Sequence, residues 1–255
     1  MGNPGSAVET PHRGAPLPGY GRLDGPVPVS YPPRLAETAR ETRDLLARGS
    51  GALAGILGAE PPDLAALVVA DEDWEAAPRE NARPYPPGLP YFTRAADPPA
   101  LVLPEGLAPV FRPRTGLLWP LAVWHELAHA FLLRRDVVKT PAWLGELVPQ
   151  AASAAVAGGS GSALDEHLRL VDRAPGFTVR GFGGRASAED QMKFQNLLLV
   201  FGAAALEEFG AAFLPRLVRA LWEEDDVVDG ERAEEVLAGA LGPGGRAWLS
   251  SRPEF

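Results

Sequence analysis

The spacing of hydrophobic residues changes along the chain and predicts different structure in different stretches. Residues 1–33 hold eight prolines and keep no hydrophobic period, which favours an extended arm. From residue 35 to residue 57 apolar positions recur at helical spacing, which predicts one helix, with a break near Gly49–Gly51 as the alternative. Short apolar runs at 65–70 and 100–103 predict two strands. The first is expected to be buried, and the proline that closes the second favours an edge strand.

After Gly116 the pattern becomes helical throughout. The segment 117–133 is apolar on nearly every side, as is typical of a buried helix. Thr140-Pro141 resembles an N-cap and first turn, and it begins a predicted helix that runs toward Val156. Further helices are predicted over residues 190–209, 211–222 and 230–241.

This order predicts one α+β domain over residues 34–255, with residues 1–33 as a Pro/Gly-rich N-terminal arm outside it. Residues 34–116 would form a small β-rich α/β lobe and residues 117–255 a helical lobe. The expected active-site cleft lies between the two lobes.

Composition narrows the chemistry that this domain can perform. A net charge of -9 disfavours nucleic acid as a partner, because nucleic-acid binders carry a basic face. No run of eighteen apolar residues occurs, so a membrane partner is not expected. The N-terminal residues lack the basic and apolar regions of a signal peptide, which favours the cytoplasm. The chain has no cysteine and only four histidines, so a metal site must use histidine and carboxylate.

Two of the four histidines lie four residues apart in His125-Glu-Leu-Ala-His129, inside the predicted buried helix. Residues at this spacing lie about 40° apart around a helix and about 6 Å apart along it, so both imidazoles can reach one ion. Glu126 projects beside that ion. Buried histidines without a metal are the alternative, but three buried ionisable groups are costly unless they are paired or bound.

A catalytic zinc site needs a third protein ligand and one open position. The continuation of the metzincin class is excluded, because Leu132 and Arg135 stand at its glycine and ligand positions. Asp136 follows a basic pair at the predicted helix end, where it would face solvent. Glu146 lies on the next predicted helix among apolar neighbours, and a helix–turn–helix would return it to the two histidines. We therefore predict Glu146 as the third ligand, over a solvated position on its helix.

The HExxH motif together with Pro141-Ala-Trp-Leu-Gly-Glu146 resembles the gluzincin metallopeptidases, and it is most similar to the bacterial peptidase-MA-like group. Weaker similarity extends over about residues 35–242. The resemblance implies a zincin-like fold, one catalytic Zn²⁺ ion, and hydrolysis of a peptide or protein substrate.

In the implied mechanism, His125, His129 and Glu146 hold the zinc, and Glu126 acts as the general base on a water molecule. Analogy with the family also places the substrate along the predicted edge strand at Leu101–Leu103. Two residues have open roles. Gln150 could accept a hydrogen bond from a ligand histidine or remain a surface amide.

Related peptidases carry a Tyr or His that stabilises the oxyanion, but all four tyrosines here precede the motif. His167 is the downstream candidate, although a solvated helix face is the favoured interpretation of its surroundings.

Two other functions fit the same residues. The first is a metal-binding but catalytically weak or inactive zincin relative that acts as a binding or scaffold module, which the missing tyrosine favours. The second is an Fe(II) oxygenase, because two histidines and one carboxylate also form a facial triad. The base Glu126 within the motif favours hydrolysis. The sequence leaves the oligomeric state open.

Overall fold

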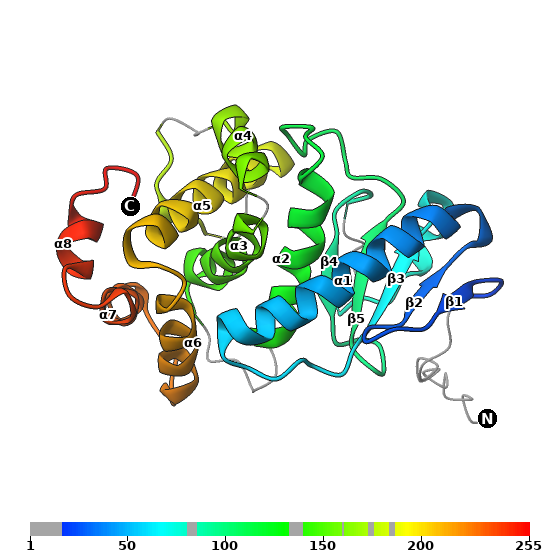
Figure 1. The fold of residues 1–255 in the computed structure, drawn as a ribbon, viewed down its shortest axis with the longest axis horizontal. Coiled ribbons are helices and arrows are strands. Elements are labelled where there is room, and N and C mark those ends of the chain that lie inside the picture. Colours follow the sequence, from blue (N-terminus) through cyan, green and yellow to red (C-terminus); the bar gives the residue numbers. More distant parts are fainter. Residues whose placement is uncertain (1–16, 81–85, 133–139, 160, 173–175, 184–186) are drawn as a thin grey trace, which may run out of the picture.

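The computed structural model combines a five-stranded sheet with eight α-helices in the residues that it describes, which are all except 1–16, 81–85, 133–139, 160, 173–175 and 184–186 (Figure 1). The strands are β1 (Gly21–Leu23), β2 (Val29–Tyr31), β3 (Ala65–Val69), β4 (Tyr91–Thr93) and β5 (Ala100–Pro104). The helices are α1 (Ala36–Leu57), α2 (Leu118–Leu132), α3 (Ala142–Gly158), α4 (Ser162–Leu170), α5 (Ala188–Phe209), α6 (Phe213–Glu223), α7 (Gly230–Leu241) and α8 (Gly245–Ser250). Short 3₁₀ turns lie at Pro33–Leu35, Asp71–Ala76 and Val179–Gly181.

The sheet has the strand order β1-β2-β3-β5-β4 and mixes both kinds of pairing. The three inner strands run parallel, and helix α1 makes the connection from β2 to β3. The outer strands β1 and β4 pair antiparallel with their neighbours. The observed architecture is therefore α+β, with a small mixed sheet at the N-terminal end and helices after it.

The expectation that residues 1–33 lie outside the folded domain is wrong for residues 21–31. These residues form β1 and β2, and β2 pairs with β3 through Val29↔Ala66 and Ser30↔Leu67. Val27 and Val29 are buried in the core. The strands are three residues long, so they are too short to show a hydrophobic period among the prolines that surround them. Residues 1–16 lie outside the described residues.

The expectation of an edge strand at Leu101–Leu103 is also wrong. Strand β5 is paired on both sides, by β3 and by β4, and all five of its residues are buried. Pro104 is tolerated because it is the last residue of the strand, opposite Val69, where a missing N–H interrupts little of the ladder. The edge strand on this side of the sheet is β4, which pairs with β5.

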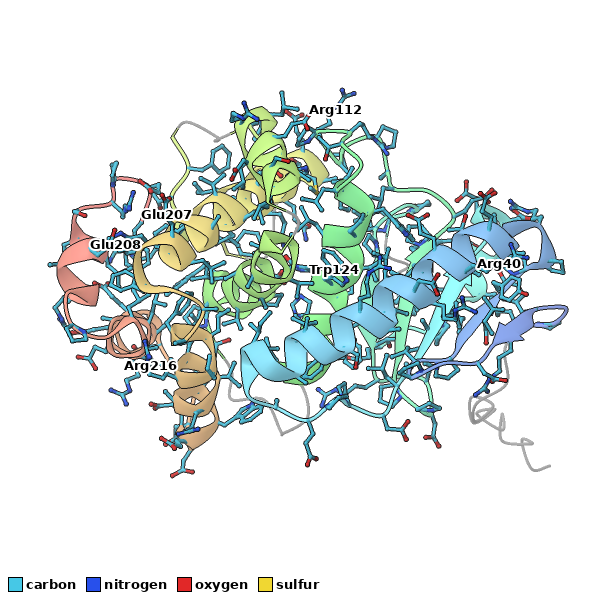
Figure 2. The ribbon with its side chains drawn as sticks, viewed as in Figure 1. Arg40, Arg112, Trp124, Glu207, Glu208 and Arg216 are labelled. Atoms are coloured by element: carbon cyan, nitrogen blue, oxygen red, sulfur yellow. The ribbon has the colours of Figure 1, made fainter. Side chains whose placement is uncertain are left out.

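The helical predictions agree with the structure. Helix α1 is continuous through Gly49, so the alternative of a break there is wrong. A Cβ atom at Gly49 would lie 2.5 Å from Cδ1 of Trp124, which shows how closely α1 approaches α2. The indole Nε1 of Trp124 donates to the Leu45 carbonyl at 3.1 Å, also across this contact. At the far end of the molecule, Arg216 of α6 donates to the Ala240 carbonyl of α7 (Figure 2).

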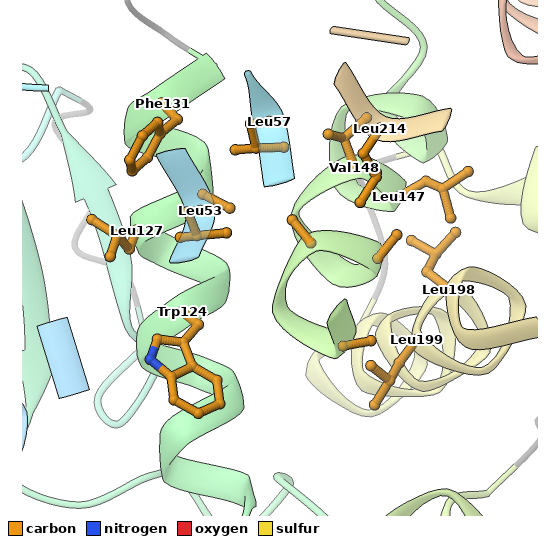
Figure 3. Close-up of a cluster of buried hydrophobic side chains, with 14 of the residues drawn as sticks. Leu53, Leu57, Trp124, Leu127, Phe131, Leu147, Val148, Leu198, Leu199 and Leu214 are labelled. Carbon is orange, nitrogen blue, oxygen red and sulfur yellow. The ribbon is translucent and has the colours of Figure 1, made fainter. Parts of the chain in front are cut away.

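Helix α2 lies at the centre of the fold. It contacts β4 and β5 on the sheet side, and it contacts α1 and α3 as well. The close-up of the core shows apolar side chains that pack between α1, α2, α3, α5 and α6: Leu53, Leu57, Trp124, Leu127, Phe131, Leu147, Val148, Leu198, Leu199 and Leu214 (Figure 3). Helices α3 and α5 also approach closely, because a Cβ atom at Gly202 would lie 3.0 Å from Ala151. In the described residues, no single helix has the length and hydropathy needed to cross a bilayer.

Candidate metal centre

Helix α2 positions the HExxH residues within the protein. Ten of its residues are buried, and they include His125 and Glu126. Its first turn carries Pro120, where a missing N–H leaves no helical hydrogen bond unmade. Helix α2 contacts the sheet as well as helices α1 and α3, and its side chains His125, Glu126 and His129 line one cleft.

The side chains of His125, His129 and Glu146 converge on one point, as the sequence predicts. The two histidine Nε2 atoms lie 3.1 Å apart, and Oε2 of Glu146 lies 3.2 Å from Nε2 of His125 and 3.5 Å from Nε2 of His129. A tetrahedral zinc ion with bonds of about 2.0–2.1 Å separates its ligand atoms by about 3.3 Å. The observed distances therefore match the ligand separations of a tetrahedral metal site. The donor set of two imidazoles and one carboxylate also suits zinc.

The charges of this cluster favour an ionised carboxylate. Burial alone would raise the pKa of Glu146, but the charge of His129 and hydrogen bonds from both histidines outweigh it and hold that pKa well below its usual range. Burial would likewise lower the pKa of His129, yet the charge and hydrogen bond of Glu146 raise it to about 9. Nδ1 of His125 is buried and has no hydrogen-bond partner among the described residues.

Glu126 lies beside the cluster but is separate from it. Its carboxylate is not among the three groups that converge, although it lines the same cleft. Burial raises the pKa of its carboxyl group, while the nearby histidines and a hydrogen bond with the backbone of Phe92 act in the opposite direction. A carboxylate with a raised pKa is a stronger base, as a proton acceptor in catalysis requires.

Of the two roles left open for Gln150, a hydrogen bond with a ligand histidine is not among the contacts of its side chain. Its Nε2 instead donates to Oε1 of Gln195 at 2.5 Å, and Nε2 of Gln195 donates to Oε2 of Glu146 at 2.9 Å. Gln195 is therefore a residue of this site that the sequence argument did not assign. The sequence feature that could have indicated it is a pair of glutamines four residues apart, Gln191 and Gln195, on a helix with apolar neighbours.

The favoured interpretation of His167 as a residue of a solvated helix face is wrong. Its side chain is 2% exposed, and Nδ1 lies 2.6 Å from Oγ1 of Thr115. Burial lowers its pKa, so the ring is neutral at pH 7. His167 lines the same cleft as the metal cluster, which makes it an available polar group there.

The cleft that contains these groups has a volume of about 310 Å³. Residues Leu89 to Phe92 supply one wall, which includes most of edge strand β4. Helices α2, α3 and α5 supply the other. The hydroxyl of Tyr91 donates to the Pro78 carbonyl at 3.0 Å, so it is engaged on the sheet side. The apolar lining consists of Leu89, Pro90, Phe92, Phe111, Leu118, Leu121, Ala122, Ala188, Met192 and Leu199.

Comparison with known proteins gives little additional information. No family model matches the chain, and no curated protein is similar to it. Among solved structures, the chain is similar to the crystal structure of an aminopeptidase N family protein from Idiomarina loihiensis, at 13% sequence identity and a TM-score of 0.40. The similarity covers 92% of this chain but 44% of that one, so this chain spans less than half of its length.

Proposed function

We propose that the chain is a zinc-dependent metallopeptidase that hydrolyses peptide bonds. One observation carries the proposal: the ligand atoms of His125, His129 and Glu146 lie 3.1–3.5 Å from one another, with Glu126 beside them in one cleft. This arrangement joins a metal-binding triad to a buried base, and that combination is the one that hydrolysis needs.

His125, His129 and Glu146 would hold the ion. Zinc bound there supplies a Lewis acid that polarises a carbonyl group and lowers the pKa of water. Glu126 accepts a proton from the attacking water and donates it to the leaving amine. Its contact with the Phe92 backbone fixes the carboxylate against β4. The apolar lining of the cleft excludes bulk water from the reacting groups.

His167 is the group that we propose to stabilise the oxyanion. It is buried and neutral and lines the cleft, and Thr115 holds its Nδ1 nitrogen. When the Thr115 hydroxyl donates to Nδ1, the proton of the ring resides on Nε2, and the ring is then a hydrogen-bond donor.

The decisive experiment combines metal analysis with a peptide-library cleavage assay. Protein purified without added metal should contain one equivalent of zinc and should cleave members of the library. Glu126→Gln keeps the shape of the side chain and removes its basicity, so zinc should remain while cleavage falls by about 10² to 10⁴-fold. Equal cleavage by the wild type and by this variant would show that the mechanism is wrong.

The remaining outcomes separate the alternatives. Stoichiometric iron with no hydrolysis would favour the oxygenase. Bound zinc with no cleavage of any library member would favour a binding or scaffold module.

A further inference from the structure

Helix α5 contacts the metal cluster through a chain of two glutamine side chains. The amide of Gln150 on α3 donates to the amide oxygen of Gln195 on α5, and Gln195 in turn donates to Glu146 on α3. This series of hydrogen bonds therefore starts at Gln150 on α3, crosses to α5, and returns to α3 at Glu146, one helical turn before Gln150. All three side chains are partly buried and line the cleft.

The direction of these hydrogen bonds orients the amide of Gln195. An amide side chain can rotate to exchange its donor and its acceptor. Because a carboxylate oxygen of Glu146 can only accept, the NH₂ group of Gln195 faces it, and the oxygen of Gln195 is left to accept from Gln150. Gln150 therefore supports the orientation that Glu146 selects, in which Gln195 donates to the carboxylate.

The oxygen that accepts this bond is the one that faces both histidines. Oε2 of Glu146 lies 2.9 Å from Nε2 of Gln195, 3.2 Å from Nε2 of His125 and 3.5 Å from Nε2 of His129. Without a metal, a protonated histidine can donate to this oxygen. With a metal, the Nε2 lone pairs of both histidines are committed to the ion. In the described contacts, Gln195 is then the group that donates a hydrogen bond to Oε2 of Glu146.

We propose that Gln195, supported by Gln150, is the positioning residue that holds Glu146 in the geometry of a metal ligand. The proposal rests on the metal site of the proposed function and assigns new roles to two residues of α3 and α5. Hydrogen-bonded partners of metal ligands typically contribute 10- to 100-fold in metal affinity. Gln195 should therefore stabilise the metal-bound state more than the metal-free state.

The test uses the full chain and two variants of one position. Gln195→Met keeps the size of the side chain and removes its donor, and Gln195→Glu keeps the shape and replaces the donor by a carboxylate oxygen. Zinc affinity, measured by competition with a chromophoric chelator, should fall about 10- to 100-fold in both. The visible absorption of the Co²⁺-loaded protein should also change, because cobalt absorption reports the geometry of the ligands.

The second residue is tested by a double-mutant cycle. Gln150→Met should weaken zinc binding less than Gln195→Met, since Gln150 acts through Gln195. In the Gln195→Met background, Gln150→Met should have no further effect. Asn196→Met is the matched control, because Asn196 is the adjacent amide on α5 and donates to the Arg112 carbonyl at 3.4 Å instead of to Glu146. This control should bind zinc and cobalt as the wild type does.

Melting of the metal-free proteins separates positioning from a general loss of stability. Metal-free Gln195→Met should melt close to metal-free wild type. Wild-type zinc affinity and a wild-type cobalt spectrum in both Gln195 variants would overturn the proposal. A loss of zinc affinity that a lower metal-free melting temperature fully explains would overturn it as well. These readouts do not depend on peptide cleavage, so a protein that binds zinc but cleaves nothing would refute the peptidase while leaving this test intact.

Discussion

The two walls of the cleft present different kinds of group. On the helical side, α2, α3 and α5 carry the three converging ligands, the buried Glu126 and the two glutamines. On the sheet side, Leu89 to Phe92 present apolar side chains and the backbone of an edge strand. The carboxylate and imidazole groups that line the cleft in the described residues therefore come from helices.

This difference has a physical reason. A helix holds neighbouring side chains at fixed rotations through its own hydrogen bonds, so two ligands on one helix are positioned before any tertiary contact forms. An edge strand has unpaired backbone groups on one side, which suits it to contact an extended chain. We infer that the helices provide the chemistry and the sheet provides a surface for the substrate.

The largest effect should follow from deleting part of the sheet. Removal of residues 17–31 deletes β1 and β2 and leaves the edge of β3 unpaired. The lost burial of Val27 and Val29 alone corresponds to about 3–6 kcal/mol, a large share of the stability of a typical domain. Thermal unfolding followed by circular dichroism should show a much lower transition or none.

The control for this deletion is Arg22→Ala, which removes a side chain that is 61% exposed on β1. Its effect should stay within about 0.5 kcal/mol. An unchanged melting temperature in the deletion variant would show that these strands do not support the domain.

A ligand substitution should give the next largest effect. His125→Ala removes one of three donors, and zinc affinity should fall by at least about 100-fold, which corresponds to about 2.7 kcal/mol. Zinc should then raise the melting temperature of the wild type and not that of the variant. Leu89→Ala changes the sheet wall and should retain wild-type zinc affinity. Comparable loss of zinc affinity in both variants would contradict the division between the walls.

Alanine substitutions at two glycines of α1 should change the stability of the protein in opposite directions. Gly49→Ala places a Cβ atom against Trp124 of α2 and should destabilise the protein by about 1–3 kcal/mol. Gly51→Ala meets open space and should stabilise it by about 0.5–1 kcal/mol through helix propensity. Chemical denaturation measures both values. Stabilisation by both substitutions would mean that α1 and α2 can separate at little cost.

The smallest effect should come from the side chain of the edge strand. Phe92→Ala removes an apolar group from the cleft wall and leaves the backbone near Glu126 in place. For a cleaved peptide, KM should rise about fivefold with kcat nearly unchanged, which corresponds to about 1 kcal/mol of binding. A fall in kcat with constant KM would instead assign Phe92 to the reacting geometry.

The candidate metal ligands could be predicted from sequence because their geometry is mostly local. The spacing of His125 and His129 fixes their relative position on any helix. Glu146 required only that the next helix return antiparallel to the first. The long helices were equally accessible, since each shows several turns of apolar periodicity.

The remaining features depend on contacts that are distant in sequence. Residues 21–31 become strands because β3 offers a partner, and β5 is central because residues 91–93 pair with its second side. His167 is buried through packing near Thr115, which lies 52 residues earlier. The role of Gln195 depends on how α5 crosses α3. No local period reveals these pairings.

The close contact between Gly202 and Ala151 has a mechanical consequence for the cleft. At this point α3 and α5 meet almost backbone to backbone, with no flexible side chain between Gly202 and Ala151 to absorb displacement, so the two helices resist sliding and separation there. The ligand on α3 and the glutamine on α5 should therefore move together as one stiff block. Any opening of the cleft would therefore involve the opposite wall, where Leu89 to Phe92 lead into and include the outermost strand β4.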